Sequence, residues 1–460
     1  FPYTTLFRSE DSRRRSFVLA SLILTFLFTL WQLLLPEASL YLCTLAPKAE
    51  IAFTVDAVTR FFAGLIAFMW LLSGVFSFEY MKHEKNHSRY YCFFLLGEGA
   101  MLGVAFAANY VTLYLCFEWM TLLTLPMVLH SQTEEAIKAG MKYLLYSFAG
   151  AFAGLMGIPF LARYGTTLNF IPGGVLDMAL VEGHEALLLG VAFAVILGFG
   201  AKAGLFPLHA WLPTAHPVAP APASAVLSGV ITKGGVLGIL RTVYYLFGAE
   251  ALRGTYVQST VLILALVTVF MGSMLAYKEK VLKKRLAYST VSQVSYVVFG
   301  LLLLQPLGFA GAILQAVFHS VAKVCLFFCA GAFICKTGKT RVEQLYGIGR
   351  SMPLPLFCFA VTGLSLVGIP PFAGFVSKWY LALGSLAAFP ALGWIGAAVL
   401  LLSALPTAGY LLSPVSKGFF PGEEFEYERI SCGWCINLPL CVLAAAALLL
   451  GLFPAQLLGW

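Results

Sequence analysis

Long uninterrupted runs of apolar residues follow one another along almost the whole chain. A helix needs roughly 18 or more apolar residues to cross the hydrocarbon core of a bilayer. Runs of about this length or longer lie at residues 17–35, 52–78, 91–108, 110–129, 141–161, 187–207, 222–247, 257–276, 287–304, 309–335, 353–384, 392–413 and 436–457. Barrel strands would instead alternate over about ten residues. The pattern therefore predicts an all-α polytopic membrane protein with about 13 transmembrane helices.

The composition agrees with a lipid environment. Hydrophobic residues make up 60% of the chain and charged residues only 11%, against about 25% in an average soluble domain. The ten cysteines are scattered. The single C-x-x-C, Cys432 with Cys435, has no second pair and no histidine near it, so we expect no metal or redox site there.

Lysine and arginine divide unevenly between the loops on the two sides of the membrane. One side receives the loops 1–16, 79–90, 130–140, 208–221, 277–286, 336–352 and 414–435, which hold most of the loop cations. The loops on the other side hold only Lys48, Arg163 and Arg253. By the positive-inside rule the basic side is cytoplasmic. The net charge of +8 therefore reflects topology and does not indicate binding of nucleic acid.

Two stretches interrupt the apolar helices at membrane depth. Residues 198–225 contain five prolines that prevent a regular helix, and residues 366–383 contain Pro370 and Pro371 after a glycine. Irregular backbone is tolerated at this depth only where protein or a water-filled cavity covers it. Two breaks in comparable places are typical of inverted repeats around an ion path. The alternative, prolines that only kink helices for packing, is less favoured because each break also contains a lysine.

These features divide the chain into segments. Residues 1–16, FPYTTLFRSEDSRRRS, lack an initiator methionine and are expected to be a non-native or disordered leader. We expect the native chain to begin earlier and to contain at least one more helix. The remaining segments are N-terminal helices (17–90), a first antiporter-like repeat (91–247), a second inverted repeat (257–413), and a C-terminal loop with the last helix (414–460).

Some basic residues lie where lipid makes a charge costly. A charge at the bilayer centre costs about 2.5–3.5 kcal/mol on insertion scales, so the side chain must pair, face water or lose its proton. The lysines well inside apolar runs are Lys202, Lys233, Lys323 and Lys378. A buried lysine can release its proton reversibly, whereas arginine stays charged, so these positions predict proton transfer. Basic side chains near the ends of runs can extend to the interface; these are Arg60, Lys142 and Arg241.

Two glutamates lie in the middle of neighbouring apolar runs, Glu98 in FLLGEGAMLG and Glu118 in LYLCFEWMTLLTL. A turn at Asn109 separates them, so at about 1.5 Å per residue they fall at similar depth. We expect one of them to pair with a lysine, and Glu118 is the stronger candidate. Glu98 could equally be a water-facing or helix-pairing glutamate.

Histidines accompany these groups. His319 and Lys323 are four residues apart and share one helix face, which predicts a relay pair. His209 and His216 belong to the first break, and they could either link the path to the cytoplasm or cap broken backbone.

No sequence motif for a cofactor is present. The chain has no Walker A loop, no G-x-G-x-x-G followed by an acidic residue, no H-E-x-x-H and no histidine pair spaced to hold a haem. We therefore expect no cofactor or metal of its own, and energy from an ion gradient or from partner subunits.

From about residue 50 to the end, the chain resembles the antiporter-like membrane subunits of respiratory complex I, membrane-bound hydrogenases and Mrp-type antiporters. The motifs that carry the resemblance are LYLCFEWMTLL, AKAGLFPLHAWLPTAHPVAPAPASAVLSGVITKGGVLGILR, LAYSTVSQVSYV, HSVAKVCLFFCAGA and GIPPFAGFVSKWY. The resemblance implies fourteen helices with two inverted five-helix repeats, the first helix being absent here. It places the functional residues of the family, a glutamate, a broken-helix lysine, a bridging lysine, a relay pair and an exit-side residue, at Glu118, Lys202, Lys233, His319 with Lys323, and Lys378. Glu98 matches no position in the family pattern.

The resemblance implies a proton-translocating subunit of a complex I-like or membrane-bound hydrogenase-like oxidoreductase in a bacterial or archaeal cell membrane. Such a subunit works with other membrane subunits and has no redox site of its own. An alternative, a subunit of a Mrp-type Na⁺/H⁺ antiporter, would use the same residues. Iron–sulfur, flavin or nickel–iron subunits among the neighbouring genes would favour the first. A scaffold with a vestigial channel is a third hypothesis.

Overall fold

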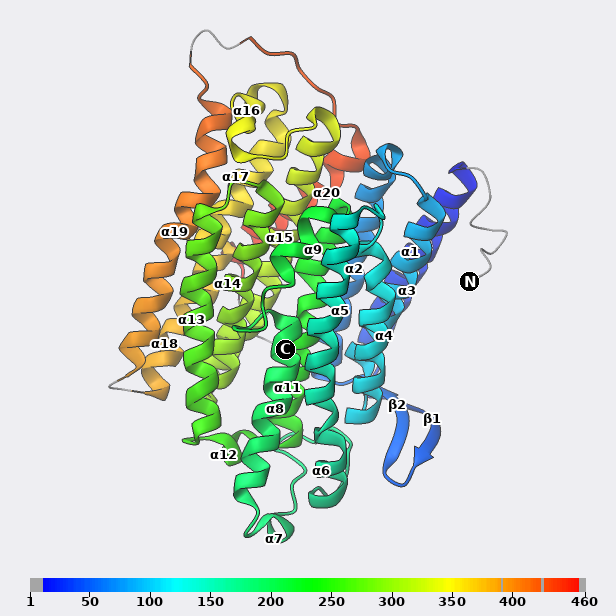
Figure 1. The fold of residues 1–460 in the computed structure, drawn as a ribbon, viewed down its shortest axis with the longest axis vertical. Helices are drawn as coiled ribbons and strands as arrows, with labels where there is room; N and C mark the ends of the chain where they lie inside the picture. The colour runs from blue at the N-terminus through cyan, green and yellow to red at the C-terminus, as the bar shows by residue number, and fades with distance from the viewer. Residues whose placement is uncertain (1–10, 390–391, 423–425, 455–460) are drawn as a thin grey trace.

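The computed structural model describes residues 11–389, 392–422 and 426–454. Most long helices run along the long axis of a single bundle, and a two-stranded hairpin lies at one end of it (Figure 1). Within the described residues, ten helices are long and apolar enough to cross a membrane. The prediction of a mostly helical, multi-pass membrane protein is confirmed.

The N-terminal part contains a β-hairpin that the sequence did not predict. Helix α1 (Asp11–Leu34) lies on the outside of the bundle and includes the last residues of the predicted leader, whereas residues 1–10 lie outside the described part. Strands β1 (Ser39–Ala46) and β2 (Ala49–Thr54) pair antiparallel. Helix α2 (Ala57–Tyr80) starts only after them, because the Asp56 side chain caps it by accepting a hydrogen bond from Thr59 N at 2.8 Å. The apolar run that starts at residue 52 therefore begins in strand β2 and continues as helix α2.

The next helices form the first half of the bundle. They are α3 (His87–Phe106), α4 (Tyr110–Val128), α5 (Glu134–Leu155), α6 (Gly157–Tyr164), α7 (Met178–Val181) and α8 (Glu185–Ala203). The turn expected at Asn109 is present, and the Asn109 side chain begins α4 by accepting from Thr112 N at 2.8 Å. Helices α3 and α4 therefore form an antiparallel hairpin with their buried faces against each other.

The first predicted break interrupts the helix after α8. Gly204 ends α8 with φ of +82°, a conformation that favours glycine. The chain then forms turns before α9 (Leu212–Val218) and α10 (Ala221–Val226). Two π-helical turns, Leu227–Ile231 and Thr242–Leu246, flank α11 (Thr232–Arg241). The proline-rich stretch is thus neither one helix nor a loop, but short helices packed inside the bundle.

The second half repeats long helices around another interruption. Its helices are α12 (Ala249–Leu252), α13 (Tyr256–Lys278), α14 (Leu282–Leu302), α15 (Pro306–Thr337), α16 (Ile348–Ser351), α17 (Pro353–Val367), α18 (Ala373–Ala388), α19 (Gly393–Phe419) and α20 (Trp434–Leu452). The apolar run 353–384 is divided into α17 and α18, with Gly368 in the left-handed conformation where α17 ends. The second break is therefore also present.

The centre of the bundle is formed by α10–α11 and by α15, which are almost wholly buried. Helices α3 and α14 and the pair α17–α18 were predicted as spans but are not among the ten, because they are more polar or shorter. The count of thirteen spans stays a prediction.

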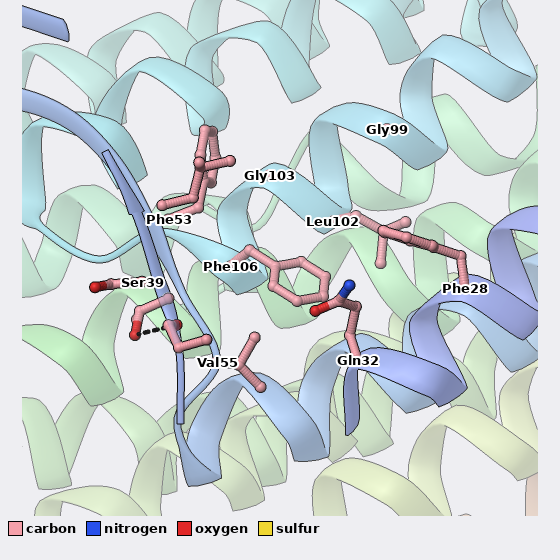
Figure 2. Close-up of a pocket in the computed structure, with 12 residues that line it drawn as sticks. Phe28, Gln32, Ser39, Phe53, Val55, Gly99, Leu102, Gly103 and Phe106 are labelled. Carbon is pink, nitrogen blue, oxygen red and sulfur yellow. Dashed lines mark hydrogen bonds between the residues drawn. The ribbon is translucent and has the colours of Figure 1, made fainter. Parts of the chain in front are cut away.

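A groove of about 410 Å³ lies between α1, the β-hairpin and α3 (Figure 2). Phe28, Leu102 and Phe106 line it together with the polar side chain of Gln32. None of the predicted site residues lines this groove. The candidate site lies inside the bundle instead.

Candidate functional site

Lys202 lies in the last turn of α8, directly before the first break, and is 1% exposed. Its Nζ donates to Tyr143 OH at 2.6 Å, Thr121 Oγ1 at 2.8 Å and Ser147 Oγ at 3.2 Å. The Tyr143 hydroxyl also lies 2.7 Å from Thr124 Oγ1. We call these five residues the Lys202 cluster. Because hydroxyls both accept and donate hydrogen bonds, the cluster can solvate an ammonium group and also pass a proton on.

Glu118 is half-buried on α4, one turn before Thr121. Its Oε1 is buried without a hydrogen-bond partner, and no ion pair joins it to a lysine within the described residues. The expected direct Glu118–lysine pair is therefore not formed. Thr121, whose hydroxyl accepts from Lys202, follows Glu118 by one turn on the same helix.

Lys233 follows the π-helical turn Leu227–Ile231, a feature that is frequent at functional sites. Its Nζ lies 2.5 Å from Nδ1 of His319 and donates to the carbonyl of Ser228 at 3.3 Å. Lys233 is 1% exposed and His319 is fully buried. This contact joins α11, in the first half of the chain, to α15 in the second half.

Lys323 lies one turn after His319 on the buried face of α15, as the spacing predicts. Its Nζ donates to the carbonyl of Leu286 at 3.0 Å, and Thr290 Oγ1 donates to the same carbonyl. Thr290 Oγ1 also lies 2.6 Å from Ser228 Oγ. Lys323 and Lys233 therefore each donate to a backbone carbonyl, that of Leu286 and that of Ser228, and neither donates to the Thr290 or Ser228 hydroxyl. No direct hydrogen bond joins Lys323 to His319 in the described part of the chain.

Lys378 lies in α18, beside the second break. Its Nζ donates to the carbonyls of Leu366 at 2.7 Å and Val367 at 2.8 Å, the last two residues of α17. These carbonyls lack partners within their own helix and form its negative end, so an ammonium group stabilises them. Carbonyls accept but cannot donate. The surroundings of Lys378 therefore hold a proton but cannot relay it, in contrast to the Lys202 cluster.

Sequence reasoning missed three hydrogen-bonded polar side chains, Gln315, Gln293 and Ser377, which we call the Gln315 group. Gln315, one turn before His319 on α15, donates to Gln293 Oε1 at 2.9 Å and accepts from Ser377 Oγ at 2.6 Å. Ser377 directly precedes Lys378. The Nε2 atoms of His319 and Gln293 are buried without partners. The spacing of four residues places Gln315 on the same helix face as His319, but no feature of the sequence showed that Gln293 and Ser377 meet it.

The two histidines of the first break make few contacts. Both ring nitrogens of His216, and Nδ1 of His209, are buried without hydrogen-bond partners within the described residues. His216 instead stacks on Phe327 of α15. His216 therefore does not cap broken backbone. A link to the cytoplasm stays a prediction for both residues.

Of the three basic residues expected to reach the interface, Arg241 does not. It is 1% exposed, and its guanidinium binds both carboxylate oxygens of Asp56, at 2.6 and 2.9 Å. The rings of Tyr245 and Phe170 lie 4.5 and 4.8 Å from its Cζ. A position near the end of an apolar run did not predict exposure of Arg241, because Asp56 at the cap of α2 pairs with it. Arg60 is half-buried and donates to the carbonyl of Leu35.

Lys142 is half-buried on α5.

Cys432 and Cys435 are free thiols. Across residues 11–389, 392–422 and 426–454, no three His, Cys, Asp or Glu side chains are grouped so as to hold a metal ion.

Comparison with known families identifies the family of the chain. The family described as "NADH:quinone oxidoreductase/Mrp antiporter, TM" matches residues 107–405, which include every predicted site residue from Glu118 to Lys378. The chain belongs to this family. A second family, "NADH-Ubiquinone oxidoreductase (complex I), chain 5 N-terminus", matches residues 46–91. The resemblance inferred from the motifs, to antiporter-like membrane subunits, is therefore confirmed.

Family members from different complexes are similar to the chain. It is 31% identical over 431 residues to an NADH-quinone oxidoreductase subunit of Desulforudis audaxviator, covering 90% of this chain and 84% of that protein. It is 29% identical over 412 residues to a Na(+)/H(+) antiporter subunit of Alkalihalophilus pseudofirmus, covering 88% and 82%. A chain of respiratory complex I from Thermus thermophilus has the same fold, with a TM-score of 0.79, 25% identity, and coverage of 96% of this chain and 92% of that one.

Proposed function

We propose that the chain is a proton-translocating antiporter-like subunit of a complex I-like or membrane-bound hydrogenase-like oxidoreductase in a bacterial or archaeal cell membrane. The observation that supports this best is the 2.5 Å contact between Lys233 and His319. It brings together buried basic side chains from the two halves of the chain. The proposal includes thirteen spans, with the inverted repeats at 91–247 and 257–413.

In this proposal Lys202 receives a proton through the hydroxyls of its cluster. A change of charge at Glu118 alters how strongly Lys202 holds that proton. Lys233 and His319 exchange protons across their short contact, and Lys323, one turn after His319 on α15, takes the proton next. Lys378 is the last site and lies beyond the Gln315 group. The driving energy comes from partner subunits, because the proposed path holds only groups that bind and release protons.

A second candidate is a subunit of a Mrp-type Na⁺/H⁺ antiporter. The similarity to the Na(+)/H(+) antiporter relative is nearly as extensive as that to the NADH-quinone oxidoreductase relative. The proposed lysine path serves both equally. Proton uptake driven by an electron donor, without added Na⁺, would favour the first candidate, and uptake driven only by a Na⁺ gradient would favour the second.

The test uses inverted membrane vesicles that contain the assembled complex, with a pH-sensitive dye as the readout. The variants Lys202→Met and Glu118→Gln should lose most proton translocation while the complex still assembles. Lys138→Met is the matched control, because Lys138 is exposed on α5 and pairs only with its helix neighbour Glu134. Normal translocation by both buried variants would refute the proton path and favour a scaffold.

A further inference from the structure

Glu98 is a buried carboxyl group that the proposed path does not use. It lies at the middle of α3 and is 2% exposed. Its Oε1 is buried without a hydrogen-bond partner, and no ion pair reaches it from any described residue. Burying a carboxyl without a partner is costly. If the position served only for packing, a buried glutamine or leucine would cost less than a buried carboxyl group. The presence of an ionisable side chain here therefore needs an explanation.

The face of α3 that bears Glu98 points into the bundle. Phe94, Gly97, Glu98 and Met101 are buried, whereas Gly99 lines the outer groove of Figure 2. Glu98 itself is not among the residues that line the groove. Its surroundings are therefore those of the helices inside the bundle and not those of lipid.

The Lys202 cluster lies on one side of this face. A Cβ atom placed on Gly97 would be 3.4 Å from the methyl group of Thr124 on α4. The Thr124 hydroxyl lies 2.7 Å from Tyr143 OH, which accepts from Lys202 at 2.6 Å. Two hydroxyls therefore separate the α3 face from the ammonium group of Lys202.

The helix that bears Lys233 lies on the other side. A Cβ atom on Gly234 would be 3.4 Å from Sδ of Met101, one turn after Glu98. Gly234 directly follows Lys233. Backbone contact between α8 and α11 is also close, since a Cβ on Gly235 would meet the carbonyl carbon of Lys202 at 3.1 Å. No hydrogen bond within the described residues, however, links the Lys202 cluster to Lys233.

No hydrogen bond connects the Lys202 cluster to Lys233 in the described part of the chain, and we propose that Glu98 exchanges protons at this interruption. Its carboxyl group would hold a proton that moves between the Lys202 cluster and Lys233. The inference rests on the proposed proton path and adds a residue to it. A proton leaves the Lys202 ammonium, passes through the hydroxyls of Tyr143 and Thr124, and adds to the Glu98 carboxylate as a neutral acid. The reverse steps return it, with no other bond made or broken.

The test compares Glu98→Gln, Glu98→Asp and Lys202→Met in the assembled complex, with the exposed Glu134→Gln as the matched control. Glutamine has the shape of the protonated acid but cannot exchange its proton. Glu98→Gln should therefore lower proton translocation by about a hundredfold, the lower end of the range for losing an acid–base group, while the thermal midpoint of unfolding does not fall. Glu98→Asp should restore part of the rate.

A second readout separates proton exchange from packing. Infrared difference spectra during turnover should contain a carbonyl band of a protonated carboxyl group that is missing in Glu98→Gln and shifted in Glu98→Asp. Glu98→Gln with the wild-type rate, alongside inactive Lys202→Met, would refute the role of Glu98 and leave the proposed function intact. Wild-type rates in both variants would refute the proposed function itself.

Discussion

The ion pair between Arg241 and Asp56 joins the last turn of α11 to the cap of α2. The guanidinium binds both carboxylate oxygens, and the arginine is 1% exposed while the aspartate is 24% exposed. Removing one partner of a buried pair leaves an uncompensated charge and costs about 3–5 kcal/mol. Asp56→Asn should therefore lower the free energy of unfolding by about this amount, or somewhat less because the aspartate is partly exposed.

The substitution to asparagine isolates the charge from the helix cap. Asparagine can still accept the hydrogen bond from Thr59 N that starts α2. Asp56→Ala loses the cap as well and should cost about 1 kcal/mol more. The double variant Asp56→Asn with Arg241→Gln removes both charges, so it should be less destabilised than the sum of the two single variants.

The assay is equilibrium unfolding in mixed micelles with increasing dodecyl sulfate, followed by tryptophan fluorescence. The wild type, Asp56→Asn, Arg241→Gln and the double variant form a double-mutant cycle. We expect a coupling free energy of at least about 2 kcal/mol, within the upper range for residues in contact. A coupling energy near zero, or a loss below about 1 kcal/mol for Asp56→Asn, would show that the pair does not hold α2 to α11.

Three further predictions concern the path and the loop after α4. His319→Gln should lower proton translocation by at least about tenfold without lowering the amount of assembled complex, because it removes the group that meets Lys233; normal dye quenching in vesicles would contradict this. Lys378→Arg should keep the cap on α17 and the thermal midpoint but lose proton translocation, because arginine does not release its proton. Lys378→Met should lower the thermal midpoint and also lose proton translocation. An active arginine variant would exclude Lys378 from the path. Burial, helped by the cation of Arg89, lowers the pKa of His130, in the loop after α4, to about 4. An unfolded histidine has a pKa of about 6.5, so the stability from neutral His130 is present above pH 6.5 and is lost as the pH falls towards 4. The loss is about 3 kcal/mol at most. The thermal midpoint of His130→Gln should therefore change less between pH 7 and pH 5 than that of the wild type, and the same pH profile in both proteins would refute this.

The sequence by itself determined the features that depend on the cost of groups in lipid. Apolar length predicted where helices lie, because unsatisfied backbone cannot face hydrocarbon. Proline content predicted both breaks. The same cost picked out Lys202, Lys233, Lys323 and Lys378, since a lysine inside an apolar run has no inexpensive place to put its charge. These inferences need only the composition of one segment at a time.

The tertiary structure alone decided which groups meet. One of the two glutamates was expected to pair with a lysine, but helix packing turns hydroxyls of α4 and α5 towards Lys202. Arg241 was expected to extend to the interface, but it is buried and pairs with Asp56 at the cap of α2. Gln315 and Gln293 come from helices whose facing sides no periodicity reveals. The reason is physical: lipid penalises a charge wherever it is exposed, but the partner that removes the penalty depends on which helix faces are brought together.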